Sequence, residues 1–229
     1  MDSINRSRET YFLDKLLDQT FGEEASEQIR AFLSTEHIYV SATREIVTKL
    51  ENLNDEFKYS QHHNPIHQVT ARVKTPRRIV EKLARKGHEM TLASARQNIH
   101  DIAGVRVICS YVDDLYLVAT LLTSQSDIEL IREIDYIKNP KPNGYRSLHL
   151  IIAVPVFMSS GPESVKVEIQ LRTIAMDFWA SLEHELAYRL ADKQTEQITR
   201  ELKDCADVIS ATDMRMQKLY NAVIQSGLG

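Results

Sequence analysis

Cysteine, glycine and long apolar runs are all scarce in this chain of 229 residues. The two cysteines, Cys109 and Cys205, are too few for a disulfide framework, which suits a reducing cytosol and predicts two buried, unreactive thiols. Seven glycines are too few for a long linker. No apolar run approaches the ~20 residues of a membrane helix, and residues 1–12 lack the apolar stretch of a signal peptide. We therefore expect a cytoplasmic protein with no membrane partner.

An excess of positive charge is also missing. The chain carries 28 Lys and Arg against 32 Asp and Glu, a net charge of -4. Because proteins that bind nucleic acid through bulk charge are usually basic, no nucleic-acid partner is expected. Hydrophobic residues at 43% and charged residues at 26% are ordinary for a globular protein, and the length suits one large domain with helical extensions.

Helical periodicity is strongest near the two ends of the chain. Residues 9–57 predict a helical region, with apolar residues in steps of four, three and four at Ile46, Leu50, Leu53 and Phe57. Residues 173–190 predict an amphipathic helix that carries the only tryptophan, Trp179.

Residues 195–225 carry a heptad-like seam with one polar break. The seam consists of Ile198, Leu202, Cys205, Ile209, Thr212, Met216, Leu219 and Val223. A seam of this kind packs either on its own domain or on another subunit, and residues 27–57 are the helical region of matching length that would cover it.

Period-two patterns predict five strands, at residues 67–74, 104–111, 128–137, 147–155 and 165–172, with a helix at 113–125 between the second and third. The last strand alternates apolar residues with a polar row made of Lys166, Glu168, Gln170 and Arg172. A half-solvated outer face would produce the same alternation as a row of functional side chains.

A basic helix is expected after the first strand, because Thr75 and Pro76 form a cap followed by proline at the first helical position. One narrow stripe holds Arg78, Lys82 and Arg85, with Lys74 nearly in line, and the opposite side holds Ile79, Val80, Leu83 and Ala84. Residues 72–86 contain seven bases and one acid. Since a solvated helix face usually mixes charges of both signs, the pattern favours an anion site.

Two carboxylates next to strands are the best candidates for a metal pair. Asp101 precedes the second strand and Glu168 lies within the last. Mg²⁺ usually takes one or two protein carboxylates and completes its shell with phosphates and water; two unrelated carboxylates at strand ends remain the alternative. Arg106, a lone base within an apolar strand, needs a protein acid or a ligand phosphate as partner.

The segment KNPKPNGYRS, residues 138–147, predicts a turn between two strands at Asn143-Gly144. Tyr145 directly after the turn could offer its ring to a purine base, and Lys141 would suit a phosphate; a hairpin with a packed tyrosine is the alternative. His63 and His67 are expected to be solvated rather than zinc ligands, because Pro65 separates them.

Four ordered segments, residues 72–87, 99–111, 135–155 and 167–186, closely resemble the small alarmone synthetases, single-domain relatives of the bacterial stringent-response synthetases. The resemblance covers about residues 60–190. It looks nearest to the branch called RelP, because HNPIH, KPNGYRSLHLII and TIAMDFWASLEH follow that pattern. The chain has no room for the hydrolase, TGS or ACT domains of the long enzymes, so we expect synthesis without hydrolysis.

The resemblance implies an α+β, nucleotidyltransferase-like fold: a mixed sheet flanked by helices. Its expected parts are an N-terminal helical region (1–60), a catalytic domain (61–190) and a C-terminal oligomerisation helix (191–229), in a homotetramer. The implied reaction moves the β,γ-diphosphate of ATP to the ribose 3′-OH of GDP or GTP, giving ppGpp or pppGpp plus AMP, with Mg²⁺ as cofactor.

The resemblance also implies residue roles. Contacts to ATP would come from Arg72, Lys74, Arg78, Lys82, Arg85 and Arg106, with Arg72 and Arg106 on the two sides of adenine. Asp101 would hold Mg²⁺, while Glu168 would bind the metal or act as base on the 3′-OH. Tyr145 would stack on guanine, and the acceptor side would be lined by Lys141, Asn143, His149 and Gln170. Ile134 stands where some relatives carry an acceptor-phosphate arginine, which leaves the choice between GDP and GTP open.

Two alternatives remain at this stage. Toxin-like relatives of the fold pyrophosphorylate tRNA 3′ ends or adenosine nucleotides, but a tRNA-directed enzyme should carry a further basic patch outside residues 72–86. A non-catalytic nucleotide sensor should have lost Asp101 or Glu168, and both are present.

Overall fold

The protein is described by a computed structural model that covers residues 23–60, 63–190 and 196–226. Five strands in these ranges form one sheet in the order β1-β2-β5-β4-β3. They are β1 (Ile66–Val73), β2 (Ala103–Cys109), β3 (Glu129–Asp135), β4 (Leu148–Met158) and β5 (Gly161–Thr173). Only the β2–β5 pair runs parallel among these strands, so the sheet is mixed, as the predicted fold class requires.

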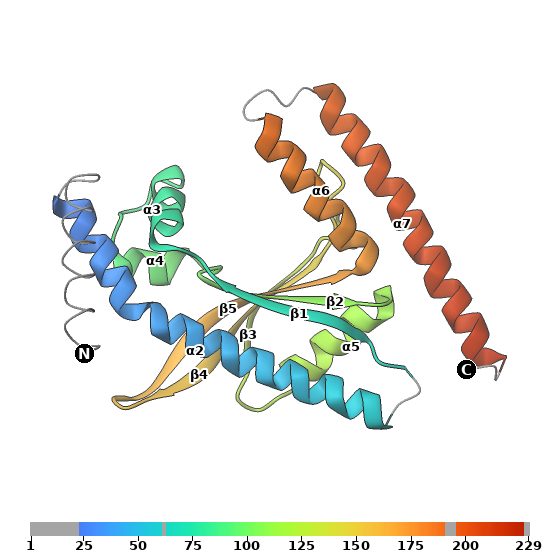
Figure 1. Ribbon diagram of the computed structural model, residues 1–229, viewed down its shortest axis with the longest axis horizontal. Helices are drawn as coiled ribbons and strands as arrows, with labels where there is room; N and C mark the ends of the chain where they lie inside the picture. The colour runs from blue at the N-terminus through green and yellow to red at the C-terminus, as the bar shows by residue number, and fades with distance from the viewer. Residues whose placement is uncertain (1–22, 61–62, 191–195, 227–229) are drawn as a thin grey trace, which may run out of the picture.

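Six helices of the described chain flank the sheet (Figure 1): α2 (Glu23–Ser60), α3 (Pro76–Arg85), α4 (Leu92–Asn98), α5 (Val112–Thr123), α6 (Ile174–Leu190) and α7 (Glu196–Gln225). The long α2 packs along the sheet, against β1, β2, β4 and β5. Towards one end of the molecule lie α3 and α4, and towards the other lie α6 and α7. None of the described helices combines the length and apolar character needed to cross a membrane.

Alternation along β5 separates the core from a polar face. The apolar residues of the strand are buried in the main core, which also contains Ile46 and Leu50 of α2 and Leu115 of α5. Burying each such side chain stabilises the folded state by about 1.5–3 kcal/mol. Because a slip of one residue would exchange the two faces of the strand, this burial fixes the register. The polar row therefore points to the opposite side of the sheet from α2.

One short helix was not predicted. The seven residues of α4 are too few for a hydrophobic period to show. Its start is marked instead by Thr91, whose hydroxyl accepts a hydrogen bond from the Ser94 N–H at 3.1 Å. The helix matters because it places the chain that leads into Asp101.

Most of the seam predicted on α7 is not packed within one subunit. The buried residues of the helix are Leu202, Ala206, Asp213 and Gln217. Two of these are polar and have partners: Asp213 accepts from the Thr173 hydroxyl at 2.6 Å, and Gln217 Oε1 accepts from the Asp113 N–H at 3.0 Å. Buried hydrogen bonds rotate the helix away from the apolar pattern, so much of the seam is left exposed.

The expected partner of the seam within one chain is wrong. The α7 helix packs on α6 and contacts α5, whereas α2, which includes most of residues 27–57, covers the sheet. Residues 9–22 of the predicted N-terminal helical region lie outside the described residues.

Three single-residue expectations need correction. Cys109 is buried, and burial raises the pKa of its thiol, but Cys205 is exposed. Ala84 is exposed because α3 packs mainly through Ile79 and Leu83. His63 is not simply solvated, since its Nε2 lies 2.9 Å from a carboxylate oxygen of Asp114.

Candidate active site

The polar face of the sheet encloses a cavity of about 270 Å³. It is lined by Thr70, Ala71, Arg72, Asp101, Gly104, Val105, Arg106, Glu168 and Gln170. The polar row of β5 therefore lines a site and is not merely a solvated face. Asp101 and Glu168, which are 67 positions apart in the sequence, lie together at this cavity.

Strand register explains how these side chains meet. Arg72 on β1, Gly104 on β2 and Glu168 on β5 are consecutive partners in one row across the sheet. A Cβ built on Gly104 would meet only backbone oxygens at 3.9 Å, an ordinary contact. The fold itself would therefore accept a side chain there, and glycine instead leaves the floor of the cavity open between Arg72 and Glu168.

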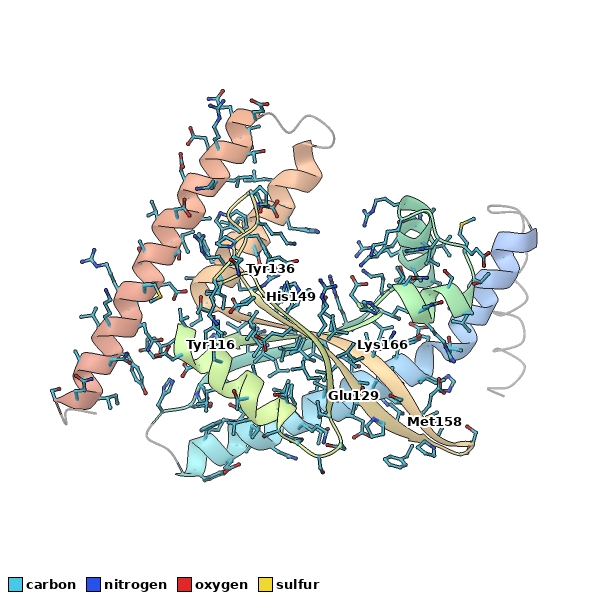
Figure 2. The ribbon with its side chains drawn as sticks, turned by 180° about the vertical axis from the view of Figure 1, so that it is seen from behind. Tyr116, Glu129, Tyr136, His149, Met158 and Lys166 are labelled. Carbon is cyan, nitrogen blue, oxygen red and sulfur yellow. The ribbon has the colours of Figure 1, made fainter. Side chains whose placement is uncertain are left out.

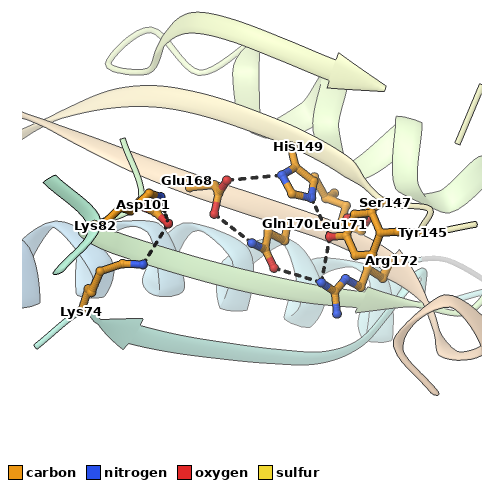
Figure 3. Close-up of polar contacts among 10 residues, drawn as sticks. All are labelled: Lys74, Lys82, Asp101, Tyr145, Ser147, His149, Glu168, Gln170, Leu171 and Arg172. Carbon is orange, nitrogen blue, oxygen red and sulfur yellow. Dashed lines mark hydrogen bonds and ion pairs between the residues drawn. The ribbon is translucent and has the colours of Figure 1, made fainter. Parts of the chain in front are cut away.

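Asp101 is held by two lysines (Figure 3). Lys74 Nζ and Lys82 Nζ both donate to Asp101 Oδ2, at 2.9 and 2.7 Å. Burial raises the pKa of Asp101, but the two lysines outweigh it and the net pKa is lowered. The carboxylate is therefore ionised at neutral pH. Its other oxygen, Oδ1, is buried without a hydrogen-bond partner among the described residues.

Glu168 is the second carboxylate of the site. His149 Nδ1 donates to Glu168 Oε1 at 3.3 Å, and Gln170 Nε2 donates to Glu168 Oε2 at 2.8 Å. Burial again raises the pKa, but the bond and charge of His149 and the bond of Gln170 lower it further, so the net pKa is lowered despite the nearby charge of Asp101. Two ionised carboxylates close enough to repel each other favour a cation between them.

A magnesium ion fits this donor set. Asp101 Oδ1 is a buried acceptor to which no described residue donates, and hard oxygen ligands are those that Mg²⁺ prefers. No group of three or more His, Cys, Asp or Glu side chains able to hold a metal occurs in the described ranges. A cation here would thus depend on one or two carboxylates plus phosphate and water oxygens.

The six basic residues expected to serve ATP fall into three pairs. Lys74 and Lys82 converge on Asp101, while Arg72 and Arg106 both line the cavity, close enough for their charges to interact. Arg78 and Arg85 lie on the exposed side of α3, and neither pairs with any acid in the part of the chain that the structure describes.

Of the two partners expected for Arg106, a protein acid or a ligand phosphate, the structure shows a protein acid, Asp177. Arg106 NH1 lies 3.3 Å from Asp177 Oδ1, and Arg172 NH1 donates to the same oxygen at 2.9 Å. Arg106 Nε is buried and has no hydrogen-bond partner among the residues that the structure describes, which leaves this donor for a ligand. Asp177 was not predicted as a site residue; its position in the first turn of α6, directly after β5, was the available signal.

The acceptor loop, residues 136–147 between β3 and β4, brings Tyr145 to the end of the polar row. The Tyr145 hydroxyl bonds to His149 Nε2 at 2.8 Å and accepts from Arg172 NH2 at 2.9 Å. Because the Glu168 carboxylate only accepts hydrogen bonds, His149 Nδ1 carries a proton and donates to it, while His149 Nε2 bonds to the Tyr145 hydroxyl. A chain of hydrogen bonds thus joins Glu168 to Tyr145 (Figure 3).

The other predicted acceptor residues lie in or beside this loop. Lys141 Nζ lies 4.5 Å from the centroid of the Tyr145 ring. If a base stacks on that ring, Lys141 is placed to bind a phosphate of the same nucleotide. Asn143 Oδ1 accepts from the Tyr145 N–H at 3.2 Å and stabilises the turn. Figure 2 shows Tyr136 and His149 on the α6 side of the sheet and Lys166 on the α4 side.

The acceptor loop packs directly against α7. Arg146 NH2 donates to Asp207 at 2.9 Å, and its NH1 donates to the carbonyl oxygen of Ala206 at 3.3 Å. A Cβ on Gly144, whose φ is 89°, would lie 2.5 Å from Ala206 Cβ. Arg146 and α7 were not predicted to support the site, because nothing in the local pattern links residues about 60 positions apart.

Comparison with known proteins agrees with this geometry. A family profile described as "Region found in RelA / SpoT proteins" matches residues 71–193. GTP pyrophosphokinase YwaC of Bacillus subtilis is 47% identical over 179 residues, which is 78% of this chain and 85% of that protein.

Two solved structures are also similar. The crystal structure of small alarmone synthetase 2 from Bacillus subtilis has a TM-score of 0.76 at 43% identity, covering 84% of this chain and 99% of that one. Small alarmone synthetase 1 from Bacillus subtilis, bound to its product pppGpp, has a TM-score of 0.75 at 36% identity, covering 81% and 94%. The chain therefore belongs to the RelA/SpoT family and, within it, to the small alarmone synthetases.

Proposed function

We propose that the protein is a GTP pyrophosphokinase that moves the β,γ-diphosphate of ATP to the ribose 3′-OH of GDP or GTP, releasing AMP. The single observation that carries the proposal is the pair of ionised carboxylates, Asp101 and Glu168, at a cavity with bases on one side and an aromatic loop on the other. Relatives named as GTP pyrophosphokinases support it. The product of this reaction, ppGpp or pppGpp, would be a signal of the bacterial stringent response.

The division of the sheet supports two nucleotide subsites. Residues assigned to ATP come from β1, the residue directly after it, β2 and α3, and residues assigned to the guanine nucleotide come from β4, β5 and the acceptor loop. Since β5 lies in the middle of the sheet, Glu168 stands between them. In-line transfer between two oriented nucleotides depends mainly on positioning and neutralised charge, which this arrangement provides.

Each group has a role that its environment favours. When ATP binds, Lys74 and Lys82 would release Asp101 and contact the ATP phosphates instead. Arg72 and Arg106 would hold adenine. Mg²⁺, held by Asp101 and Glu168, would neutralise phosphate charge. Because the pKa of Glu168 is lowered, it is a weak base, and its environment favours orienting the 3′-OH or binding the cation over full proton abstraction.

The choice of acceptor decides between this function and its alternatives. The purified protein would be incubated with ATP and Mg²⁺ plus, separately, GMP, GDP, GTP and tRNA, with products resolved by anion-exchange chromatography. Formation of AMP and a 3′-pyrophosphorylated guanine nucleotide is expected. Modification of tRNA or of adenosine nucleotides alone would identify a toxin-like enzyme, and nucleotide binding without AMP release would identify a sensor. The cytoplasm, where these nucleotides are available, is the proposed location.

Tyr145→Ala is expected to weaken binding of GDP or GTP by about 1–3 kcal/mol, the scale of base–aromatic stacking, with ATP binding nearly unchanged. Tyr145→Phe is the matched control, since it keeps the ring but removes the hydroxyl contacts to His149 and Arg172. Titration calorimetry with each nucleotide alone separates the effects. An equal loss for both nucleotides would show that Tyr145 supports the fold instead.

We also propose that the protein assembles as a homotetramer through α6 and α7. Both helices expose rows of apolar side chains that are between 44 and 68% accessible: Ile174, Phe178, Leu182 and Leu186 on α6, and Val208, Met216, Leu219 and Val223 on α7. Contiguous apolar surface of this kind is an association hazard on a monomer and typical of subunit interfaces.

Two charge substitutions on α7 test the assembly. Met216→Glu, on the exposed row, is expected to shift the protein to smaller, folded species in gel filtration with light scattering. Ile209→Glu, on the side packed near Trp179, is expected to lower the melting temperature because a charge is buried there. A wild-type protein that runs as a 26 kDa monomer at micromolar concentration would rule out the interface.

A further inference from the structure

Arg132 on β3 lies on the cavity side of the sheet and has no part in the roles above. Arg132 belongs to one row of paired residues that crosses all five strands of the sheet. In strand order the row is Arg132 on β3, Ile151 on β4, Glu168 on β5, Gly104 on β2 and Arg72 on β1. Neighbouring strands are about 4.8 Å apart, so Arg132 and Arg72 stand roughly 10 Å from Glu168 on opposite sides of one row. The two arginines thus flank Glu168 symmetrically.

The Arg132 side chain is available for a ligand. It is exposed, and no residue that the structure describes forms a hydrogen bond or ion pair with it. A buried apolar residue, Ile151, separates it from Glu168, so the two side chains do not neutralise each other across the row.

The side of the sheet identifies the ligand. Arg72 lies in the half assigned to ATP, whereas Arg132 lies on the outermost strand of the acceptor half. The 5′-carbon and the 3′-hydroxyl lie on opposite faces of a ribose ring. A nucleoside with its base on Tyr145 and its 3′-OH towards Glu168 on β5 therefore directs its 5′-phosphates away from β5, over β4 and β3.

On that path Arg132 offers a second cation beyond Lys141, which lies over the Tyr145 ring itself. Ile134, the next cavity-side residue of β3, is apolar and pairs with His149. The side chain of Glu133, between them, points to the other face because neighbours along a strand alternate. A guanidinium offers a planar fork of donors that matches phosphate oxygens, and such charge-assisted bonds are stronger than neutral ones.

We propose that Arg132 binds the distal 5′-phosphates of the guanine nucleotide acceptor and thereby determines selectivity for GDP and GTP over GMP. The inference rests on the proposed function and names a specificity residue within it. Arg132 lies two residues from Ile134 on the same face of β3. The strand therefore still offers a positive charge to the acceptor, but not at the position where some relatives carry an arginine.

The variant Arg132→Gln tests this assignment. KM for GTP and GDP is expected to rise about 10-fold or more, the scale of a charge-assisted bond to phosphate, while KM for ATP stays within about twofold. KM for GMP, which lacks the distal phosphates, should change little. Lys49→Gln makes the same charge change near the start of β3, where Lys49 pairs with Asp127 away from the cavity, and should leave all four values unchanged.

A relocation variant makes the test independent of a general loss of activity. The double variant Arg132→Gln/Ile134→Arg returns the charge to the same face of β3, two residues closer in sequence to Tyr145. It is expected to recover much of the GTP affinity. Equilibrium binding of GTP and GMP without ATP, measured on wild type and both variants, gives a readout that needs no turnover.

Three outcomes would overturn the inference. A rise in KM for ATP instead of GTP would assign Arg132 to the donor, and an equal loss for GMP and GTP would show that it does not bind distal phosphates. Unchanged GTP binding in Arg132→Gln would remove it from the site. Failure of the proposed function is distinct, because the wild-type protein assayed in parallel would then yield no AMP with any guanine nucleotide.

Discussion

Turnover of Glu168→Gln is expected to fall by at least about 10²-fold, the usual scale for losing a group that assists proton transfer. Glutamine keeps the size of the side chain but removes the negative charge that orients the 3′-OH or holds Mg²⁺ beside Asp101. It also disturbs the bonds from His149 and Gln170, because an amide offers only one acceptor oxygen where the carboxylate offers two.

A matched control exists on the same strand. Glu163 also lies on β5 but pairs with Arg96 outside the cavity, at 3.0 Å. Glu163→Gln makes the same chemical change and is expected to keep near-normal synthesis, because exposed ion pairs contribute only about 0–1 kcal/mol. Single-turnover rates of AMP release and melting curves for both variants separate chemistry from folding. Near-normal synthesis by a folded Glu168→Gln protein would contradict the assignment.

Alternation along β5 allowed the polar row to be predicted from sequence, because the two faces of a half-buried strand differ in composition. What the row faces could not be predicted in the same way. Asp101 and Glu168 meet only through the parallel pairing of β2 with β5, and the register that places Gly104 beside Glu168 is a tertiary property. The two carboxylates were predicted from their places next to strands and the nucleotide roles of the neighbouring residues from family resemblance, whereas the contacts among them come from the structure.

The α7 helix shows the opposite case. Its apolar period correctly predicted a helix over residues 195–225, but the face that packs is set by Asp213, Gln217 and Ala206. A method that counts apolar residues cannot foresee that Thr173 and the Asp113 N–H will satisfy two buried polar groups. The apolar residues left outside then become the evidence for an interface.

The contact between α7 and the acceptor loop gives the second large expected effect. Gly144→Ala is expected to lower kcat/KM for the guanine nucleotide on the order of 10²-fold, the cost of small misplacements at a reacting group. The new Cβ would lie 2.5 Å from Ala206 Cβ and 3.2 Å from Lys203 Cα, so either the loop or the helix must shift. The shift moves Tyr145, the next residue, while the bases on β1 and α3 stay in place, so ATP binding should persist.

Two further variants isolate the cause. Gly161 also has a positive φ, 117°, but a Cβ there meets nothing within 4 Å, so Gly161→Ala carries the backbone strain without the clash and should keep its activity. Adding Ala206→Gly to Gly144→Ala removes the colliding methyl group and should restore part of the guanine-nucleotide affinity, at a cost of about 1 kcal/mol of helix stability. Binding of GDP and ATP would be measured for all three beside their melting temperatures. If Gly161→Ala and Gly144→Ala lose activity equally, or if Ala206→Gly rescues nothing, α7 does not position the acceptor loop and the packing at Gly144 only supports the fold.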